Sequence, residues 1–367
     1  MSEQSPHGPN PPGLDLLALS DWLATAAPGL VDGPLTAEVV AGGKSNLTYR
    51  VTDGTTRVIV RRPPLGHVLA TAHDMAREFR VMDALADTTV PVPLMLASCS
   101  DDNVIGSPFY VMEHVDGVPY RTREQLEPLG PERTRDISER MVDTLADLHS
   151  VDPQSVGLGD FGRPEGFLAR QVKRWGQQLD SSHSRDLVGS DDLRTRLAAS
   201  VPGPERESPA AIVHGDYRLD NILTRDTFAH DELAAVVDWE MATLGDPLTD
   251  IALLITYQRV AQQGATGVST VSLAPGFLSE DEIISRYAAR SGRDLTHLGF
   301  YEALACFKLA VILEGIHYRF AQGQTVGEGF AAVGEMVGPL IALGHEAMDR
   351  LERTTDPTDP TDPTGTH

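Results

Sequence analysis

The stretch V-H-G-D-Y-R-L-D-N-I-L, residues 213–223, carries the residues that decide the fold of this chain. Asp216 stands five positions before Asn221, and Asp238 follows at the end of the apolar run L-A-A-V-V-D. A carboxylate can accept the proton of an attacking hydroxyl, and an amide oxygen with a second carboxylate can hold Mg²⁺. This combination is what phosphoryl transfer from a magnesium nucleotide requires.

The spacing of these residues predicts a β-hairpin. Asn221 opens a strand at 222–224, the polar residues 225–232 turn the chain, and residues 233–237 return. We expect this hairpin to bring Asn221 and Asp238 near each other, beside the loop that carries Asp216.

The order H-x-D-x-x-x-x-N, here His214, Asp216 and Asn221, resembles the catalytic loop of the protein-kinase-like superfamily. With Gly215 after the histidine and D-W-E-M-A-T-L-G-D-P-L-T-D at 238–250, the chain resembles the aminoglycoside-phosphotransferase-like family. The resemblance implies an α+β, bilobal, protein-kinase-like fold with a small antiparallel β N-lobe and a larger helical C-lobe. It also implies transfer of the γ-phosphoryl group of ATP or GTP to a hydroxyl of a small molecule, with Mg²⁺.

The resemblance assigns roles to the acidic residues. Asp216 is expected to be the base, and Asn221 and Asp238 the Mg²⁺ ligands. The sequence D-W-E departs from the family's D-x-D or D-F-G pattern, so Glu240 either touches a second metal or forms an ion pair. Two further residues are expected to support the loop, His214 from within it and Asp250 by hydrogen bonds from the start of a helix.

The basic residue expected to contact the nucleotide phosphates departs from the pattern of the family that the chain resembles. The strand R-V-I-V-R-R-P-P, residues 57–64, places Arg61 where the family has a lysine, and Glu78 is its expected partner. Arginine can bridge phosphate oxygens bidentately, so this replacement is chemically sensible. Alternation along the strand turns Arg62 to the other face, but a shift of one residue in register would exchange the two arginines.

Two more segments are expected to hold the nucleotide. Gly42 and Gly43 form a turn over the phosphates, with backbone donors from Ser45 and Asn46. The segment F-Y-V-M-E-H-V-D-G, residues 109–117, resembles the hinge of kinase-like folds, whose backbone near Glu113 and Val115 would pair with adenine.

The acceptor site is the least determined part. Arg170 and Arg174 share one face of the predicted helix in R-Q-V-K-R-W, residues 170–175, after D-F-G-R-P-E-G-F at 160–167. This combination resembles the kinase-like domain fused to some acyl-CoA dehydrogenases, which implies a hydroxylated acyl acceptor with an anionic group. A solvated helix face explains the same arginines. Further acceptor-site candidates are Glu240, Glu314, Tyr318 and Arg319.

Composition narrows the class of partner. The chain has 367 residues, enough for two domains or lobes, and 53 acidic against 30 basic residues give a net charge of −23. Such a chain is a poor candidate for binding nucleic acid or an anionic membrane. An acidic cleft would attract cationic acceptors such as aminoglycosides, although a solvated acidic surface gives the same composition. The family resemblance implies nucleotide and a small hydroxyl compound as the partners.

Two cysteines outside any C-x-x-C pair and an N-terminus without a basic or apolar segment favour a cytoplasmic protein without a signal peptide. Prolines and polar residues predict disordered tails at 1–13 and 351–367. Between them we expect a nucleotide-binding N-lobe at 14–115 and a helical C-lobe at 116–350 that holds the catalytic loop and acceptor site. Helices are expected at 14–27, 72–85, 136–148, 167–179, 248–263, 280–291 and 301–322, and strands at 37–40, 47–51, 57–60 and 108–114.

Two other functions compete with phosphotransfer. A regulator that binds nucleotide without catalysis fits Arg61 in place of lysine, but the intact Asp216, Asn221 and Asp238 argue against it. A metal-dependent hydrolase built on His214, Asp216 and Asp238 lacks a further histidine near the motif to complete a ligand set.

Overall fold

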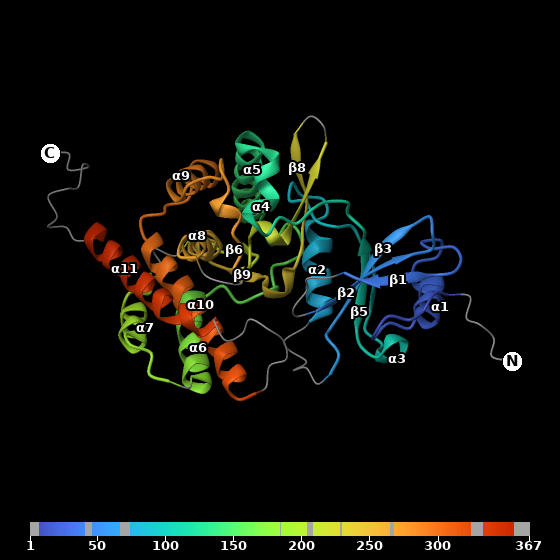
Figure 1. The fold of residues 1–367 in the computed structure, drawn as a ribbon, viewed down its shortest axis with the longest axis horizontal. Helices are drawn as coiled ribbons and strands as arrows, with labels where there is room; N and C mark the ends of the chain where they lie inside the picture. Colours follow the sequence, from blue (N-terminus) through green and yellow to red (C-terminus); the bar gives the residue numbers. More distant parts are fainter. Residues whose placement is uncertain are drawn as a thin grey trace. The chain divides into compact units, whose positions relative to one another are not determined.

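The computed structural model describes residues 7–40, 46–66, 74–183, 185–203, 208–227, 230–264, 268–323 and 333–355. The chain forms two compact units. The first unit comprises Met1–Val118, Ile222–Arg225 and Leu233–Ala242, and the second comprises Pro119–Asn221, Asp226–Glu232 and Thr243–His367. An antiparallel sheet dominates the first and helices dominate the second, so the predicted α+β kinase-like fold class is confirmed (Figure 1).

The first unit is built on one five-stranded sheet in the order β1-β2-β3-β5-β4, and all neighbouring strands run antiparallel. Its strands are β1 Thr36–Val39, β2 Leu47–Thr52, β3 Arg57–Arg62, β4 Met95–Cys99 and β5 Phe109–Glu113. Its helices are α1 Leu16–Ala26, α2 Met75–Leu85 and α3 Asp102–Ile105.

The two faces of this sheet pack against different helices (Figure 1). Side chains of one parity, including Val58, Val60 and Phe109, join the buried leucines of α1 in a single apolar core. The opposite parity faces α2, where the rings of Tyr110 and Phe79 meet edge to face at 6.4 Å. Because side chains alternate along β3, Arg61 lies on the α2 face and Arg62 on the α1 face.

The predicted hairpin is present as β7 Ile222–Asp226 and β8 Asp231–Val236. The helical region expected at 116–350 includes this hairpin, whereas residues 222–225 and 233–236 of its arms belong to the first unit. Backbone bonds explain the difference. Val118 pairs with Thr224 in an isolated bridge, and the N–H of Val236 donates to the carbonyl of Pro91 at 2.8 Å. Asn221 is the last residue of a short 3-10 helix before β7.

The second unit is a helical assembly in which α10 Leu298–Ala321 packs against α6, α8 and α11. Besides α10, the α-helices described in this unit are α4 Arg123–Leu126, α5 Pro131–Ser150, α6 Phe167–Ser182, α7 Ser190–Ala199, α8 Leu248–Gln262, α9 Glu280–Ser291 and α11 Val337–Thr355. A short antiparallel pair, β6 Ala211–Val213 and β9 Thr243–Gly245, lies on either side of the catalytic motifs in sequence. Among the described residues, every helix is too short or too polar to cross a lipid bilayer.

The predicted tails need correction at both ends. Within 7–13, the N–H of Gly8 donates to the carbonyl of Leu35 at 2.9 Å, and the hydroxyl of Tyr49 donates to the carbonyl of Pro12 at 2.6 Å. At the other end, α11 continues five residues past the expected boundary and buries Leu351. Local composition predicted disorder, but hydrogen bonds and apolar contacts order these segments.

The ordered N-terminal segment gives a first prediction. The side chain of Asn10 accepts the N–H of Leu16 at 3.0 Å and so caps the first turn of α1. Asn10→Ala should lower the free energy of unfolding in urea by ~1 kcal/mol, the usual cost of a lost cap. Asn103→Ala, which removes an amide bonded to the exposed Asp101, is the matched control. Equal effects of the two substitutions would mean that residues 7–13 do not support α1.

Candidate active site

The catalytic loop of the second unit is held by the buried carboxylate of Asp250. One oxygen accepts the backbone N–H of His214 at 2.7 Å, and the other accepts that of Gly215 at 2.8 Å. Gly215 has a φ of +86°, in the left-handed region that favours glycine, which explains its place after the histidine. The expected bonding of Asp250 to the loop backbone is confirmed.

Behind Asp250 lies a second layer of hydrogen bonds that the sequence did not reveal. His149 of α5 places Nε2 3.3 Å from Asp250, and Tyr287 of α9 places its hydroxyl 2.7 Å from Nδ1 of His149. Burial lowers the pKa of His149. A neutral ring that donates from Nε2 and accepts at Nδ1 satisfies both contacts. Burial raises the pKa of Asp250, but the hydrogen bonds from His149 and Gly215 and the nearby histidine rings together lower it below its usual value.

The loop presents Asp216 with both carboxylate oxygens engaged. Tyr257 of α8 donates its hydroxyl to Oδ1 at 2.7 Å. Asn221 donates its amide to Oδ2 at 3.1 Å and to the Asp216 carbonyl at 2.9 Å. Nε of Arg218 lies 3.4 Å from Oδ2. The Asp216 side chain nevertheless keeps 26% of its surface exposed, so a base at this position is accessible to an acceptor.

A buried lysine also contacts this loop. Lys308 of α10 donates to the carbonyl of Gly215 at 3.0 Å, and burial lowers its pKa. Its ammonium lies 5.9 Å from the ring centre of Trp175, and the Arg174 guanidinium lies 5.4 Å from the same centre. Sequence analysis assigned no role to Lys308. The rarity of lysine could have drawn attention to this residue, because the chain has only three lysines against many arginines.

The first unit carries a separate acidic cluster around Glu78 of α2. Asn46 donates to Glu78 Oε1 at 2.9 Å, and Tyr110 donates to Oε2 at 2.9 Å. Nε of Arg61 lies 3.0 Å from Oε2, although it is not aligned for a hydrogen bond, and the same guanidinium contacts Asp238. The predicted ion pair between Arg61 and Glu78 is thus confirmed, and so is the strand register.

Arg62, unlike Arg61, forms hydrogen bonds that stabilise the fold of the first unit. Its guanidinium is buried and donates to the carbonyls of Gly13 and Ile105, the latter at 2.8 Å. These bonds join β3 to the N-terminal segment and α3.

The acidic cluster joins the carboxylates of Glu78, Asp238 and Glu240 around Arg61. Arg61 is the cation in contact with Glu78 and Asp238, and the Asn46 amide links Glu78 to Glu240 through a further bond of 3.1 Å. Burial, together with the neighbouring acids and against the attraction of Arg61, raises the pKa of Glu78 to about 7. A proton on Glu78 near neutral pH therefore reduces the repulsion between the acids of this cluster.

Asp238 is also distinguished by its backbone. Among the described residues other than glycine, it alone has a positive φ, at 67°. Such a conformation is costly and concentrates at functional sites. Its carboxylate is a hard oxygen ligand of the type that Mg²⁺ prefers. Within the described ranges no group of three or more His, Cys, Asp or Glu is arranged to hold a metal, whereas Mg²⁺ on a nucleotide needs one or two protein ligands.

The structure describes only some of the remaining residues that were predicted to bind the nucleotide. Glu113 ends β5, and its N–H already donates to the carbonyl of Leu94 at 2.9 Å. Val115 follows in the segment after the strand. Gly42, Gly43 and Ser45 lie outside the described residues.

Several acceptor candidates are occupied by internal contacts. The guanidinium of Arg170 contacts the carbonyls of Arg163 and Glu165. Glu314 is fully buried and pairs with Arg185 at 2.8 Å. Arg174 and Arg319 are exposed, and Tyr318 is half-buried.

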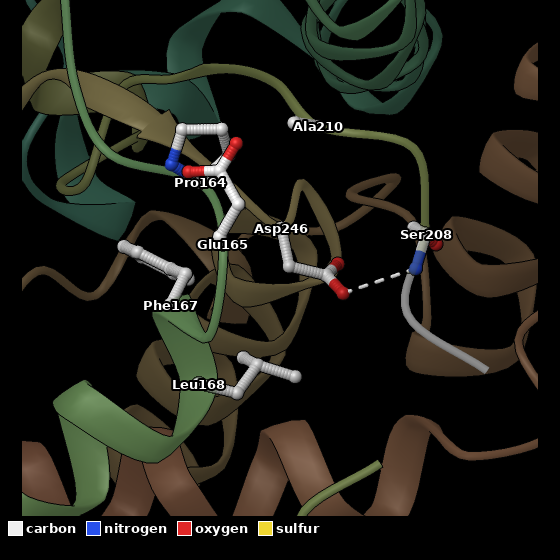
Figure 2. A pocket seen from close by; sticks show the side chains of 8 residues that line it. Pro164, Glu165, Phe167, Leu168, Ser208, Ala210 and Asp246 are labelled. Carbon is white, nitrogen blue, oxygen red and sulfur yellow. Dashed lines mark hydrogen bonds between the residues drawn. The ribbon is translucent and has the colours of Figure 1, made fainter. Parts of the chain in front are cut away.

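A cavity of about 230 Å³ in the second unit contains none of the predicted site residues (Figure 2). Asp246 faces it and is bonded to the N–H groups of Ser208 and Leu248 and to the hydroxyl of Tyr301. The cavity is lined by Pro164, Glu165, Phe167, Leu168, Ser208, Ala210, Gly245 and Asp246.

Comparison with known proteins agrees with this geometry. The model of the phosphotransferase enzyme family matches residues 36–283, about two thirds of the chain. The chain belongs to this family. The five-stranded sheet of the first unit, the loop of Asp216 and the helices from α4 to α8 lie within the matched residues.

Among similar family members, a candidate aminoglycoside phosphotransferase from Ralstonia eutropha is 33% identical, with a TM-score of 0.80 over 92% of this chain and 98% of that one. Acyl-CoA dehydrogenase family member 11 from Gallus gallus is 35% identical over 343 residues, 91% of this chain and 43% of that protein. The chain thus spans less than half the length of this curated relative. A thermostable mutant of aminoglycoside phosphotransferase APH(4)-Ia, in ternary complex with ADP and hygromycin B, shares the fold at 12% identity and a TM-score of 0.58, over 91% of this chain and 98% of that one.

The raised pKa of Glu78 predicts a pH dependence. A folded-state pKa of about 7 lies above the ordinary value of 4.5, so the folded protein binds this proton more tightly than the unfolded chain. The stabilisation is complete below about pH 4.5 and is lost as the pH rises towards 7. The unfolding free energy of wild type minus that of Glu78→Gln should therefore fall across this window, by up to ~3 kcal/mol.

Urea titrations at several pH values measure this difference. Asp21→Asn, which changes an exposed carboxylate of the same unit, is the control substitution. A difference that rises with pH for Glu78→Gln would show that Arg61 and Tyr110 keep Glu78 ionised.

Proposed function

We propose that this protein transfers the γ-phosphoryl group of ATP or GTP to a hydroxyl of a small molecule, with Asp216 as the base. The observation that carries the proposal is the held but accessible carboxylate of Asp216, fixed by Tyr257 and Asn221. Phosphoryl transfer needs little covalent help and proceeds by positioning and charge neutralisation. A carboxylate fixed at both oxygens can orient the acceptor hydroxyl and take its proton.

Asn221 and Asp238 are proposed to hold Mg²⁺, which neutralises the charge of the transferring phosphate when bound. The amide nitrogen of Asn221 is bonded to Asp216, so its amide oxygen would be the atom that binds the metal. The positive φ of Asp238 and its hard carboxylate oxygens support a cation at this residue. Nucleotide as co-substrate is supported by the related phosphotransferase that was solved with ADP.

Arg61 is proposed to contact the phosphates, oriented by its ion pair with Glu78. The turn over the phosphates is proposed to be formed by Gly42 and Gly43, with backbone donors from Ser45 and Asn46. Because the N–H of Glu113 is already used within the first unit, its carbonyl and the N–H of Val115 are the groups proposed to meet adenine.

The acceptor is proposed to be a hydroxylated compound with an anionic group, such as a hydroxylated acyl compound. Three cationic side chains, Arg218, Lys308 and Arg174, lie in the part of the second unit that carries Asp216 and Trp175. Their positive charges would repel a cationic acceptor locally, although the chain as a whole carries a net negative charge. Similarity to an acyl-CoA dehydrogenase family member supports the same class.

A nucleotide-binding regulator without catalysis is the second candidate. The observation that favours it is Arg61, whose guanidinium engages the carboxylate proposed to bind Mg²⁺. Magnesium-dependent nucleotide binding without any phosphoryl transfer would support this candidate.

Asp216→Asn should lower the rate of Mg²⁺-dependent ADP formation by about a hundredfold or more, because an amide cannot accept the proton. Nucleotide affinity should be unchanged. Asp191→Asn, an exposed substitution of the same kind on α7, is the matched control. A turnover of Asp216→Asn within threefold of wild type would remove Asp216 from the role of base.

Asp238→Ala should abolish the Mg²⁺ dependence of nucleotide binding while the protein stays folded. Calorimetric titration with ATP, in Mg²⁺ and in EDTA, measures this dependence directly. Asp53→Ala provides a control in the same unit, since that carboxylate caps a surface turn. If Asp238→Ala binds Mg·ATP as wild type does, the metal site lies elsewhere.

A further inference from the structure

The hydroxyl of Tyr257 contacts one oxygen of the proposed base. It donates to Oδ1 of Asp216 at 2.7 Å, a shorter contact than those of Asn221 and Arg218 with the same carboxylate. Asn221 and Arg218 both approach the other oxygen, Oδ2, at 3.1 and 3.4 Å. The two oxygens therefore have different neighbours, and a rotation of the carboxylate would break the bond from Tyr257.

Tyr257 also contacts the second neighbour of the base. The guanidinium of Arg218 stacks 5.1 Å from the centre of the Tyr257 ring, and Arg218 pairs with Asp220 at 3.2 Å. One side chain of α8 thus holds the carboxylate with its hydroxyl and supports the adjacent cation with its ring.

We propose that Tyr257 is a positioning residue that fixes the rotation of the Asp216 carboxylate towards the acceptor hydroxyl. This inference rests on the proposed phosphotransfer. A hydroxyl that donates to a carboxylate contributes more than a neutral hydrogen bond, and an unheld carboxylate samples orientations that cannot accept the proton. Burial raises the pKa of Tyr257 well above its usual value, so the phenol remains a donor.

The two contacts of Tyr257 can be separated by substitution. Tyr257→Phe removes the hydroxyl and keeps the ring under Arg218, whereas Tyr257→Leu removes both. If the hydroxyl positions the base, Tyr257→Phe should lower kcat about ten- to a hundredfold, the range expected for a lost bond to a charged group. Tyr257→Leu should then add little to this loss.

Tyr301→Phe is the matched control. Tyr301 also donates to a buried aspartate at 2.7 Å in the second unit, but its acceptor is Asp246 at the start of α8. Both Phe variants lose one such bond, so their melting temperatures should fall by similar amounts. Only Tyr257→Phe should lose kcat, with the KM for ATP and the dissociation constant for Mg·ATP within twofold of wild type.

The assay is Mg²⁺-dependent ADP formation from ATP, with water as acceptor and then with choline, hygromycin B and hydroxyacyl-CoA thioesters. Wild-type kcat in Tyr257→Phe, together with an inactive Asp216→Asn, overturns the positioning role and leaves the proposed function intact. Equal losses of kcat in Tyr257→Phe and Tyr301→Phe overturn it as well, because they indicate a general structural effect. No ADP from wild type, or full activity in Asp216→Asn, overturns the proposed function itself.

Discussion

The candidate base depends on one buried interaction, the bonds that Asp250 accepts from the backbone of the catalytic loop. Two N–H groups, of His214 and Gly215, end on this carboxylate. A buried charge is costly unless it is fully bonded, and the His149 ring supplies the remaining contact. Because the acceptor is rigid and buried, the loop is fixed immediately before Asp216. The side chains that touch Asp216 then act on a carboxylate whose backbone is already fixed.

The acidic cluster of the first unit follows a different principle. Asp250 is satisfied by neutral donors, whereas Glu78 and Asp238 share the single guanidinium of Arg61. Burial and the neighbouring acids, against the attraction of Arg61, raise the pKa of Glu78 to about 7. The loop of Asp216 is thus a closed network that holds its geometry, whereas the charge of the cluster around Arg61 changes with protonation of Glu78.

Sequence predicted the elements whose signals are local. The alternation in β3 separated Arg61 from Arg62, and the spacing of Asp216 and Asn221 predicted the hairpin β7–β8. Tyr257 and His149 were not found because their roles arise from contacts between residues 41 and 101 positions apart. A tyrosine in an apolar helix and a histidine at a helix end look ordinary until the acceptor is known.

Two errors at the ends of the fold have a related cause. In α11, apolar residues recur at helical spacing, with Leu340, Ala347 and Leu351 buried, but the polar tail that follows obscured this pattern. In the N-terminal segment, order comes from hydrogen bonds to residues far along the chain, such as Gly8 to Leu35. The composition of a segment indicates whether the segment can form a hydrophobic core by itself. It does not indicate whether the segment packs against, or hydrogen-bonds to, a core formed by other residues.

The most direct test of phosphoryl transfer follows the phosphorus atom. The protein is incubated with Mg²⁺, ATP labelled with ³²P at the γ position, and hydroxyl acceptors of cationic, neutral and anionic type. The account predicts that label moves from ATP into a phosphate monoester of an acceptor, and that an anionic acceptor is preferred. Label that remains in ATP with every acceptor, although Mg·ATP is bound, would contradict the account.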